Sequence, residues 1–239
     1  MKNKNLLFTS AGDKTAFFNN WVDPNQEYDI YVCYYGNKTD KPYEKYCKYY
    51  LERKGSKFQN FYYVWCNDPI VKTYENYFIV DDDIIIKSNE INELYKILID
   101  YNLYILQPSF KKGSKISHPI TLQKSNNLLR YTNFIEVTAM MFPFEALQKC
   151  MDIYDPILVG WGIDYLFLWK LNHKFKNKFA IVDKISCINP NTLEDQREIN
   201  ILQPQDIRKQ TWETLAETLN IKEYRHKTYK TLELIQSSI

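Results

Sequence analysis

The stretch FIVDDDIIIKS, residues 78–88, places three consecutive aspartates directly after a run of large apolar residues. The apolar run predicts a buried strand that ends where the acids begin. Neighbouring carboxylates repel each other by about 1 kcal/mol per pair in water, and by more where solvent is excluded. A bound cation would offset this repulsion, so the stretch predicts a buried strand with a metal-binding end.

Strand and helix patterns alternate over the first two hundred residues. One clear helix pattern begins at Ser88, where Ile91, Leu94, Tyr95 and Leu98 form a one-sided apolar stripe. We therefore expect an α/β fold of the Rossmann-like kind, with a mostly parallel central sheet covered by helices on both faces. The predicted strands are 4–12, 28–36, 77–83, 103–107 (stopped by Pro108), 131–142 and 179–188, and the predicted helices are 14–22, 56–65, 88–102, 144–154 and 165–175.

The C-terminal residues differ from the rest of the chain. From Pro204 on we expect a helical extension, so the predicted division is a catalytic domain at 1–203 and an extension at 204–239. A basic cluster follows the apolar face of this helix. It is either the solvated end of a helix packed on the core or a surface that contacts an anionic membrane or a partner. The cluster comprises Lys222, Arg225, His226, Lys227 and Lys230.

Composition narrows the function classes. The 239 residues are 45% hydrophobic, enough for a core in one largish domain. A net charge of +2 gives no reason to expect nucleic acid as a partner. The five cysteines have no zinc-type spacing, which favours free thiols in the cytoplasm, and we see neither a secretory leader nor a membrane span.

The position of the acidic triplet predicts its chemistry. Ligands of open α/β sheets bind beyond the carboxyl ends of the strands. On an extended chain Asp81 and Asp83 point to one side and Asp82 to the other. Such a carboxylate pair suits Mg²⁺ or Mn²⁺, which complete their shells with substrate phosphates and water. The alternative is a solvated turn in which one aspartate caps the next helix.

A second motif, GWGID at residues 160–164, opens a predicted helix. Its glycines permit close approaches, and Trp161 offers a flat face for a sugar ring. Asp164 falls in the first helical turn, where the helix dipole favours the ionised carboxylate. Asp164 is therefore a candidate general base that takes a proton from an attacking hydroxyl. The alternative is an ordinary helix start with Trp161 in the core.

Taken together, FIVDDDI and GWGID resemble the glycosyltransferases of the GT-A fold, and the GWG-plus-acid element resembles the acceptor motif of the β-1,4-galactosyltransferases. The order DDDI, ILQPS, SHPIT, RYTNFIEV, GWGID and AIVDKI is similar to a glycosyltransferase-like domain-of-unknown-function family of plants and bacteria. The resemblance covers about residues 5–190. It implies a nucleotide-sugar donor and a divalent cation, Mn²⁺ or Mg²⁺.

The resemblance also implies roles for particular residues. Asp81 and Asp83 would bind the metal, and Asp164 would be the catalytic base. Donor binding would fall to Ser10, Gly12, Asp13, Lys57 and Asp82, and contacts to the sugar or acceptor would fall to Gln107, His118, Arg130, Glu136, Trp161 and Gly162. For Arg130 and Glu136 a mutual ion pair is the alternative.

This chain departs from the family at one place. The family tends to have a metal-binding histidine after the strand that corresponds to AIVDKI, where this chain reads CINPN, with Asn189 near the position. Metal binding completed by water, or a metal-independent enzyme, therefore stays open.

The expected function is metal-assisted transfer of a sugar from a nucleotide-sugar to a hydroxyl of a glycan or lipid-linked acceptor. We expect inversion at the anomeric carbon, although a retaining enzyme would share the acidic triplet. If the source is bacterial, synthesis of surface polysaccharide is the expected setting, in the cytoplasm or at the cytoplasmic face of the inner membrane, with the basic C-terminal end near the membrane where lipid-linked acceptors reside. The alternatives are a sugar nucleotidyltransferase, for which SAGDK (10–14) is a poor phosphate loop, and a binding module without turnover.

Overall fold

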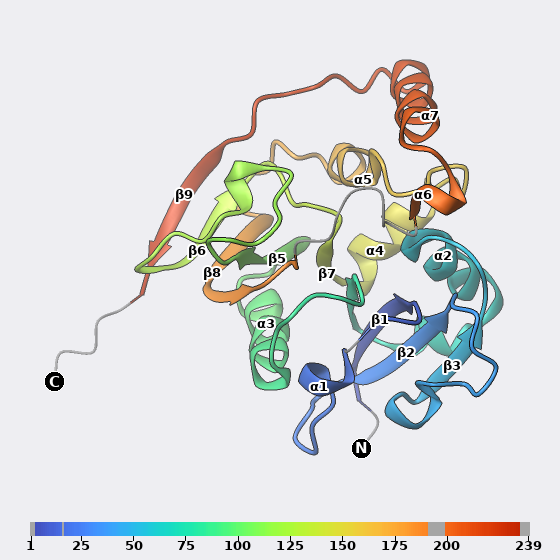
Figure 1. The fold of residues 1–239 in the computed structure, drawn as a ribbon. Coiled ribbons are helices and arrows are strands. Elements are labelled where there is room, and N and C mark those ends of the chain that lie inside the picture. The colour runs from blue at the N-terminus through green and yellow to red at the C-terminus, as the bar shows by residue number, and fades with distance from the viewer. Residues whose placement is uncertain (1–2, 16, 191–198, 235–239) are drawn as a thin grey trace, which may run out of the picture.

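A single nine-stranded sheet forms the centre of the computed structural model, which describes residues 3–15, 17–190 and 199–234 (Figure 1). Its strand order is β3-β2-β1-β4-β7-β5-β8-β6-β9. The pairings make β6 and β7 run against the other seven strands, so the predicted mostly parallel sheet is confirmed. The strands are β1 Asn5–Ala11, β2 Asp29–Tyr34, β3 Tyr49–Glu52, β4 Asn76–Val80, β5 Ile105–Phe110, β6 Asn127–Thr132, β7 Ala139–Pro143, β8 Phe179–Cys187 and β9 Thr228–Glu233.

Helices cover both faces of this sheet, as Figure 1 shows. On one face, α2, α4 and α5 pack over a core that contains Phe61, Phe142 and Phe167. On the other face, α1 and α3 pack over a core that contains Trp21 and Leu94. The helices are α1 Phe18–Trp21, α2 Lys57–Asn67, α3 Ser88–Asp100, α4 Phe144–Met151, α5 Ile163–Lys170, α6 Ile199–Leu202 and α7 Gln205–Thr218. None of the described helices is long and apolar enough to span a bilayer.

Local sequence explains where the two longer helices near the site begin. The backbone N–H of Ser56 donates to the Gln59 side chain (2.9 Å) at the start of α2, and that of Lys87 donates to Glu90 (2.9 Å) at the start of α3. Each contact satisfies one backbone donor at the N-terminus of its helix. The first turn of α2 thereby places Lys57 near the end of β4.

Two strand predictions were wrong in detail. Pro108 does not end β5, because the strand continues to Phe110 through a register shift against β8 between Pro108 and Ser109. Proline is tolerated at such irregularities because no ladder hydrogen bond is needed there. The predicted strand 131–142 corresponds to parts of two strands, the end of β6 and most of β7, which are separated by residues 133–138. Both strands run antiparallel to their neighbours in the sheet. The segment between the two strands also contains apolar residues, so the sequence pattern showed no break between β6 and β7.

The C-terminal extension is helical only as far as Thr218. Residues 221–227, which we call the C-terminal strap, run in extended form from α7 across the molecule to β9 (Figure 1). Strand β9 then pairs with β6 at the edge of the sheet. The threonines and tyrosine of TYKTLE favour a strand over a helix. Residues 235–239 of the predicted extension lie outside the described residues.

Candidate active site

The acidic triplet follows β4 and is anchored at its first residue. The Asp81 N–H donates to the carbonyl oxygen of Thr138 (3.0 Å). The Lys57 ammonium lies 2.7 Å from Asp81 Oδ1 and also donates to the carbonyl oxygens of Val137 (2.8 Å) and Thr138 (2.9 Å). Only 9% of the Lys57 side chain is exposed. Helix α2 therefore supplies a nearly buried cation that offsets part of the repulsion among the three aspartates.

Asp82 binds a different neighbour. Its Oδ2 accepts a hydrogen bond from the Gly12 N–H (3.0 Å), and its carbonyl oxygen accepts one from the Thr15 hydroxyl (2.6 Å). The chain leaves the extended conformation at Val80, so the triplet forms a turn rather than a strand end. Asp82 orients this turn against the loop after β1, while Asp83 is exposed.

The residues near the turn fit a cation only with help from a substrate. Across residues 3–15, 17–190 and 199–234, no three side chains of His, Cys, Asp or Glu are arranged to hold a metal ion. Asp81 and Asp83 still provide the hard oxygen donors that Mg²⁺ and Mn²⁺ prefer, and these ions often use one or two carboxylates together with phosphates and water. Hydrogen bonds between Ile85 and Ile188 (2.9 and 3.0 Å) bring Asn189 close to this turn.

The predicted donor-side residues gather at the ends of β1 and β2. Ser10 is buried, and its hydroxyl accepts from the Asn60 amide (3.0 Å). Asp13 accepts a short hydrogen bond from the Tyr34 hydroxyl and two from the Asn37 N–H (3.1 and 3.2 Å). The bond from Tyr34 is the main cause that lowers the pKa of Asp13. Asp13 is thus an ionised carboxylate on a rigid loop.

The GWGID motif forms the start of α5. Gly160 (φ +81°) and Gly162 (φ +78°) are both in the left-handed region that favours glycine. Between them the Trp161 side chain is 37% exposed, so it is not a core residue. Asp164 is 6% exposed, and its burial raises the pKa of the carboxyl to about 6. A carboxyl with this pKa is mostly ionised at neutral pH and suits a general base.

Glu136 is a second buried carboxyl beside Asp164. Its Oε1 accepts from the Thr138 hydroxyl (3.1 Å), whereas its Oε2 is buried and has no hydrogen-bond partner among the described residues. Burial, followed by the negative charge of Asp164, raises the pKa of Glu136 to about 7. The Glu136 N–H donates to the Gln107 amide oxygen (2.5 Å), so buried Gln107 positions the segment that carries this glutamate.

The Val137 peptide connects the two acidic groups. The N–H groups of Tyr165 (2.9 Å to Asp164 Oδ1) and Val137 favour the ionised form of Asp164 and partly oppose its raised pKa. The Val137 carbonyl oxygen accepts from Lys57, which in turn binds Asp81. The structure therefore brings Asp81, Lys57, Glu136 and Asp164 to one site at the carboxyl end of β4.

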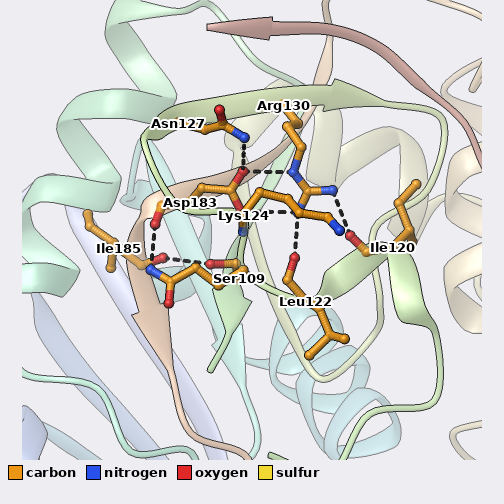
Figure 2. A network of polar contacts seen from close by, with 9 residues as sticks. Ser109, Ile120, Leu122, Lys124, Asn127, Arg130, Asp183 and Ile185 are labelled. Atoms are coloured by element: carbon orange, nitrogen blue, oxygen red, sulfur yellow. Dashed lines mark hydrogen bonds and ion pairs between the residues drawn. The ribbon is translucent and has the colours of Figure 1, made fainter. Parts of the chain in front are cut away.

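Arg130 belongs to another polar network, which Figure 2 shows. It forms a buried ion pair with Asp183 (Nε to Oδ2 2.7 Å, Nη2 to Oδ1 3.0 Å) and donates to the carbonyl oxygens of Ile120 and Leu122. The alternative in which Arg130 pairs with Glu136 is wrong, because Asp183 takes that place. Four N–H contacts inside the protein make Arg130 a support for the loop 118–124.

His118 lies in an aromatic cluster rather than in a polar one. Its ring packs 4.4 Å from that of Phe134 and 5.1 Å from that of His226. Burial lowers the pKa of His118 to about 4, so its imidazole is neutral at physiological pH. His118 is thus a neutral, half-buried imidazole that packs between Phe134 and His226 of the C-terminal strap.

Sequence reasoning missed the residues that hold the C-terminal segment over GWGID. A Cβ on Gly162 would lie 2.0 Å from Trp212 Cδ2 of α7, and one on Gly160 would lie 2.8 Å from Ile199 Cδ1 of α6. The Tyr165 hydroxyl contacts His226 Nε2 (3.0 Å). The apolar face of the predicted C-terminal helix, which includes Trp212, indicated that this helix packs on the core. It did not indicate that the packing partner is the GWGID motif.

No family model and no curated protein sequence matches the chain. Solved structures do match, at identities that show the fold alone. The structure of S. aureus TarS has a TM-score of 0.55 at 11% identity and covers 91% of this chain and 43% of TarS. The TarS 1–349 structure in complex with UDP-GlcNAc has a TM-score of 0.56 at 12% identity, over 92% of this chain and 68% of that one.

A third match is the structure of GalNAc-T7 with UDP, GalNAc and Mn²⁺, with a TM-score of 0.62 at 11% identity, over 90% of this chain and 48% of that one. The chain thus spans less than half the length of full TarS and of GalNAc-T7 as solved. The order of strands and helices described above, together with these matches, shows that the chain has the fold of the GT-A glycosyltransferases.

Proposed function

We propose that this chain transfers a sugar from a nucleoside-diphosphate sugar to a hydroxyl of a saccharide acceptor. The observation that carries the proposal is the buried Asp164, linked through the Val137 peptide and Lys57 to the acidic turn at Asp81. A transfer reaction needs a base for the acceptor and a charged site for the departing diphosphate. This arrangement provides both within one site.

The donor would lie between the loop after β1 and the acidic turn. Ser10, Gly12 and Asp13 would face the nucleoside, and Asp82 would hold their loop in place through Gly12. Lys57 would stabilise the negative charge of the diphosphate. TarS and GalNAc-T7 were solved with UDP-GlcNAc and with UDP, which makes UDP-sugars the first donors to test.

In the transfer step, the acceptor oxygen attacks the anomeric carbon while the bond between that carbon and the diphosphate oxygen breaks. The acceptor proton passes to the Asp164 carboxylate, and the bonding electron pair leaves with the diphosphate. An attack opposite the leaving group inverts the anomeric carbon. Glu136, Gln107, His118, Trp161 and Gly162 would border the sugar and the acceptor.

A divalent cation, Mn²⁺ or Mg²⁺, held by Asp81 and Asp83 would neutralise charge on the leaving diphosphate. Lys57 already places one positive charge at Asp81, so part of this stabilisation belongs to the chain itself. We propose the surface polysaccharide of a cell as the setting, with a glycan or lipid-linked saccharide as acceptor and with the enzyme at the cytoplasmic face of the membrane.

Donor hydrolysis and binding test the function. The wild-type protein should bind UDP by calorimetry, and it should release UDP slowly from UDP-GlcNAc or UDP-GalNAc when Mn²⁺ is present. Asp164→Asn should lower turnover by about 10²–10⁴-fold with little change in UDP affinity. Asp152→Asn, which changes an exposed aspartate at the end of α4, is the matched control.

The outcomes separate the alternatives. A protein that binds UDP but never turns over a donor would be a binding module of the same fold. A protein that releases pyrophosphate from UTP and a sugar phosphate would be a nucleotidyltransferase. Absence of any nucleotide binding would remove the basis of the proposal.

A further inference from the structure

A cavity of about 680 Å³ lies between the C-terminal strap and the turn at Pro119–Thr121. This volume falls in the range of cavities that bind small molecules. Pro119, Ile120 and Tyr165 line one side, and Glu223, Tyr224, Arg225, His226 and Thr228 line the other. We call it the strap cavity.

The strap that forms one wall is fixed in place by Asn133. The buried Asn133 amide donates to the Arg225 carbonyl oxygen (3.0 Å) and accepts from the Lys227 N–H (2.6 Å). The Asn133 N–H also donates to the Lys227 carbonyl oxygen (3.1 Å). Three hydrogen bonds from one residue hold the strap on the core, so the cavity exists before any ligand arrives.

The aromatic rings of the cavity are equally fixed. The Tyr224 ring stacks on His173 at 3.9 Å between centroids, and its hydroxyl donates to the Asn133 carbonyl oxygen (3.1 Å). The His226 ring stacks on Phe134 at 3.9 Å, and its Nε2 lies 3.0 Å from the Tyr165 hydroxyl. Rings held in this way lose little conformational entropy when a ligand packs on them.

The strap cavity is lined by Tyr165, the residue next to the candidate base, while Asp164 itself lies buried behind it. Tyr165 directly follows Asp164 and is hydrogen-bonded to it through its N–H (2.9 Å). Burial and then the negative charge of Asp164 raise the pKa of Tyr165 to about 12, and the same two causes raise that of Tyr224. The carboxylate is therefore close enough to influence residues on both sides of the cavity.

We propose that the strap cavity is the acceptor subsite and that it binds a pyranose ring of a saccharide. This inference rests on the proposed function, because it takes Asp164 as the base that the acceptor hydroxyl must reach. Flat aromatic walls match the C–H faces of a pyranose, while the exposed Arg225 and Glu223 are placed to bind its hydroxyls or a carboxylate. The C-terminal segment, not the sheet, then selects the acceptor.

Saturation-transfer NMR with simple glycosides tests the subsite. The probes are methyl glycosides of glucose, galactose and N-acetylglucosamine, and methyl glucuronide, each at millimolar concentration with the full-length protein and no donor. At least one probe should give saturation transfer with the wild type. Tyr224→Ala should weaken its binding roughly tenfold or abolish it, as expected for the loss of one stacking surface.

Two further variants keep the test decisive if Tyr224→Ala does not fold. Arg225→Ala removes an exposed side chain and should weaken the same probe without unfolding the protein. Tyr63→Ala, which removes an exposed tyrosine of α2 that does not line the strap cavity, is the matched control and should leave probe binding unchanged. If no probe binds to the wild type, the subsite proposal is overturned. It is also overturned if both Tyr224→Ala and Arg225→Ala leave probe binding unchanged.

Calorimetry with UDP separates this failure from failure of the proposed function. If the protein binds UDP but no glycoside, the proposed donor site is supported and the strap cavity is not the acceptor subsite. If the protein binds glycosides through Tyr224 but does not bind UDP, the saccharide subsite is supported and the transferase proposal is overturned.

Discussion

Lys57 and Asp81 form the contact that makes the acidic turn possible, with 2.7 Å between the ammonium nitrogen and Oδ1. The lysine comes from the first turn of α2 and the aspartate from the end of β4. Two backbone carbonyl oxygens, those of Val137 and Thr138, complete the surroundings of the ammonium. One side chain thereby connects the donor half of the sheet to the segment that carries Glu136.

Replacing Lys57 should therefore affect both stability and donor binding. Lys57→Met leaves the Val137 carbonyl oxygen and Asp81 Oδ1 without the ammonium donor, while the Thr138 carbonyl oxygen keeps the Asp81 N–H. A partly buried contact of this kind is worth about 1–3 kcal/mol. We expect the free energy of unfolding in urea to fall by this amount and the affinity for UDP to fall as well. Lys96→Met, which changes an exposed lysine of α3 that pairs with Glu27, is the control for donor binding. Unchanged UDP affinity in Lys57→Met would contradict a role at the diphosphate.

The pH dependence of transfer should report Asp164. Its pKa is raised to about 6 by burial, so the carboxylate becomes the working base as pH rises through 6. We expect kcat/KM to increase from pH 5 to pH 7 and then level off. Asp164→Asn should remove the rise together with most of the activity. A profile that stays flat between pH 5 and pH 7 would show that another group is the base.

The stability of the protein should fall with pH over a similar range because of Glu136. Its pKa is raised from 4.5 to about 7 in the folded state, so the folded protein binds the proton more tightly than the unfolded chain does. The stabilising contribution is full below about pH 4.5 and is lost as pH rises through about 7. Since one pKa unit corresponds to 1.36 kcal/mol, the loss is on the order of 3 kcal/mol.

Glu136→Gln tests this assignment. The amide is always neutral, so the variant should lose this part of the pH dependence and should be more stable than the wild type at pH 8. Urea unfolding at pH 5 and pH 8 measures both effects. Glu145→Gln, a glutamate in the first turn of α4, should keep the wild-type slope. An unchanged slope in Glu136→Gln would assign the pH dependence to other groups.

Sequence patterns predicted the strands that carry the site because those strands are short apolar runs with clear ends. YFIV indicated β4, and GWGID indicated the start of α5, but the strand ends at Val80 and the DDD triplet, expected to be extended, forms a turn. Tyr49–Glu52 was not recognised as a strand because it is half-buried at the sheet edge and rich in tyrosine. Edge strands lack the continuous apolar run that identifies interior ones.

The site itself was harder to predict because its contacts join residues far apart in the chain. Lys57 was expected to bind the donor, but only the fold places its ammonium against the end of β4 and the carbonyl oxygens before β7. Arg130 was expected near the sugar, yet β8 supplies Asp183 as its partner. Charge and spacing indicate which residues need partners, and tertiary structure decides which partners they find.

Arg130 gives the clearest expected loss of stability. Arg130→Met would leave the Asp183 carboxylate buried without its cation, and breaking such a pair typically costs 3–5 kcal/mol. Figure 2 shows that Asn127 and the Lys124 N–H also bind Asp183, which would keep part of its charge satisfied. Thermal unfolding should reveal a lower midpoint. Arg130→Met with Asp183→Leu should recover part of the loss, and a double variant no more stable than the single one would contradict this account.

The packing of α7 on the GWGID motif can be tested at Gly162. A Cβ there would lie 2.0 Å from Trp212 Cδ2, on a residue with φ +78°. Gly162→Ala should therefore suffer both backbone strain and a clash, together on the order of 2–4 kcal/mol in the free energy of unfolding. Gly113→Ala has a similar φ of +91°, and no atom of the described residues lies within 4 Å of its Cβ, so it measures the strain without a clash of this kind. The difference between the two variants isolates the contact with Trp212.

In a double-mutant cycle, Trp212→Ala should remove most of that difference because it removes the clashing ring. Additive effects in the cycle would mean that α7 does not pack on Gly162 in solution, and the strap that follows α7 would then lose its support over Asp164.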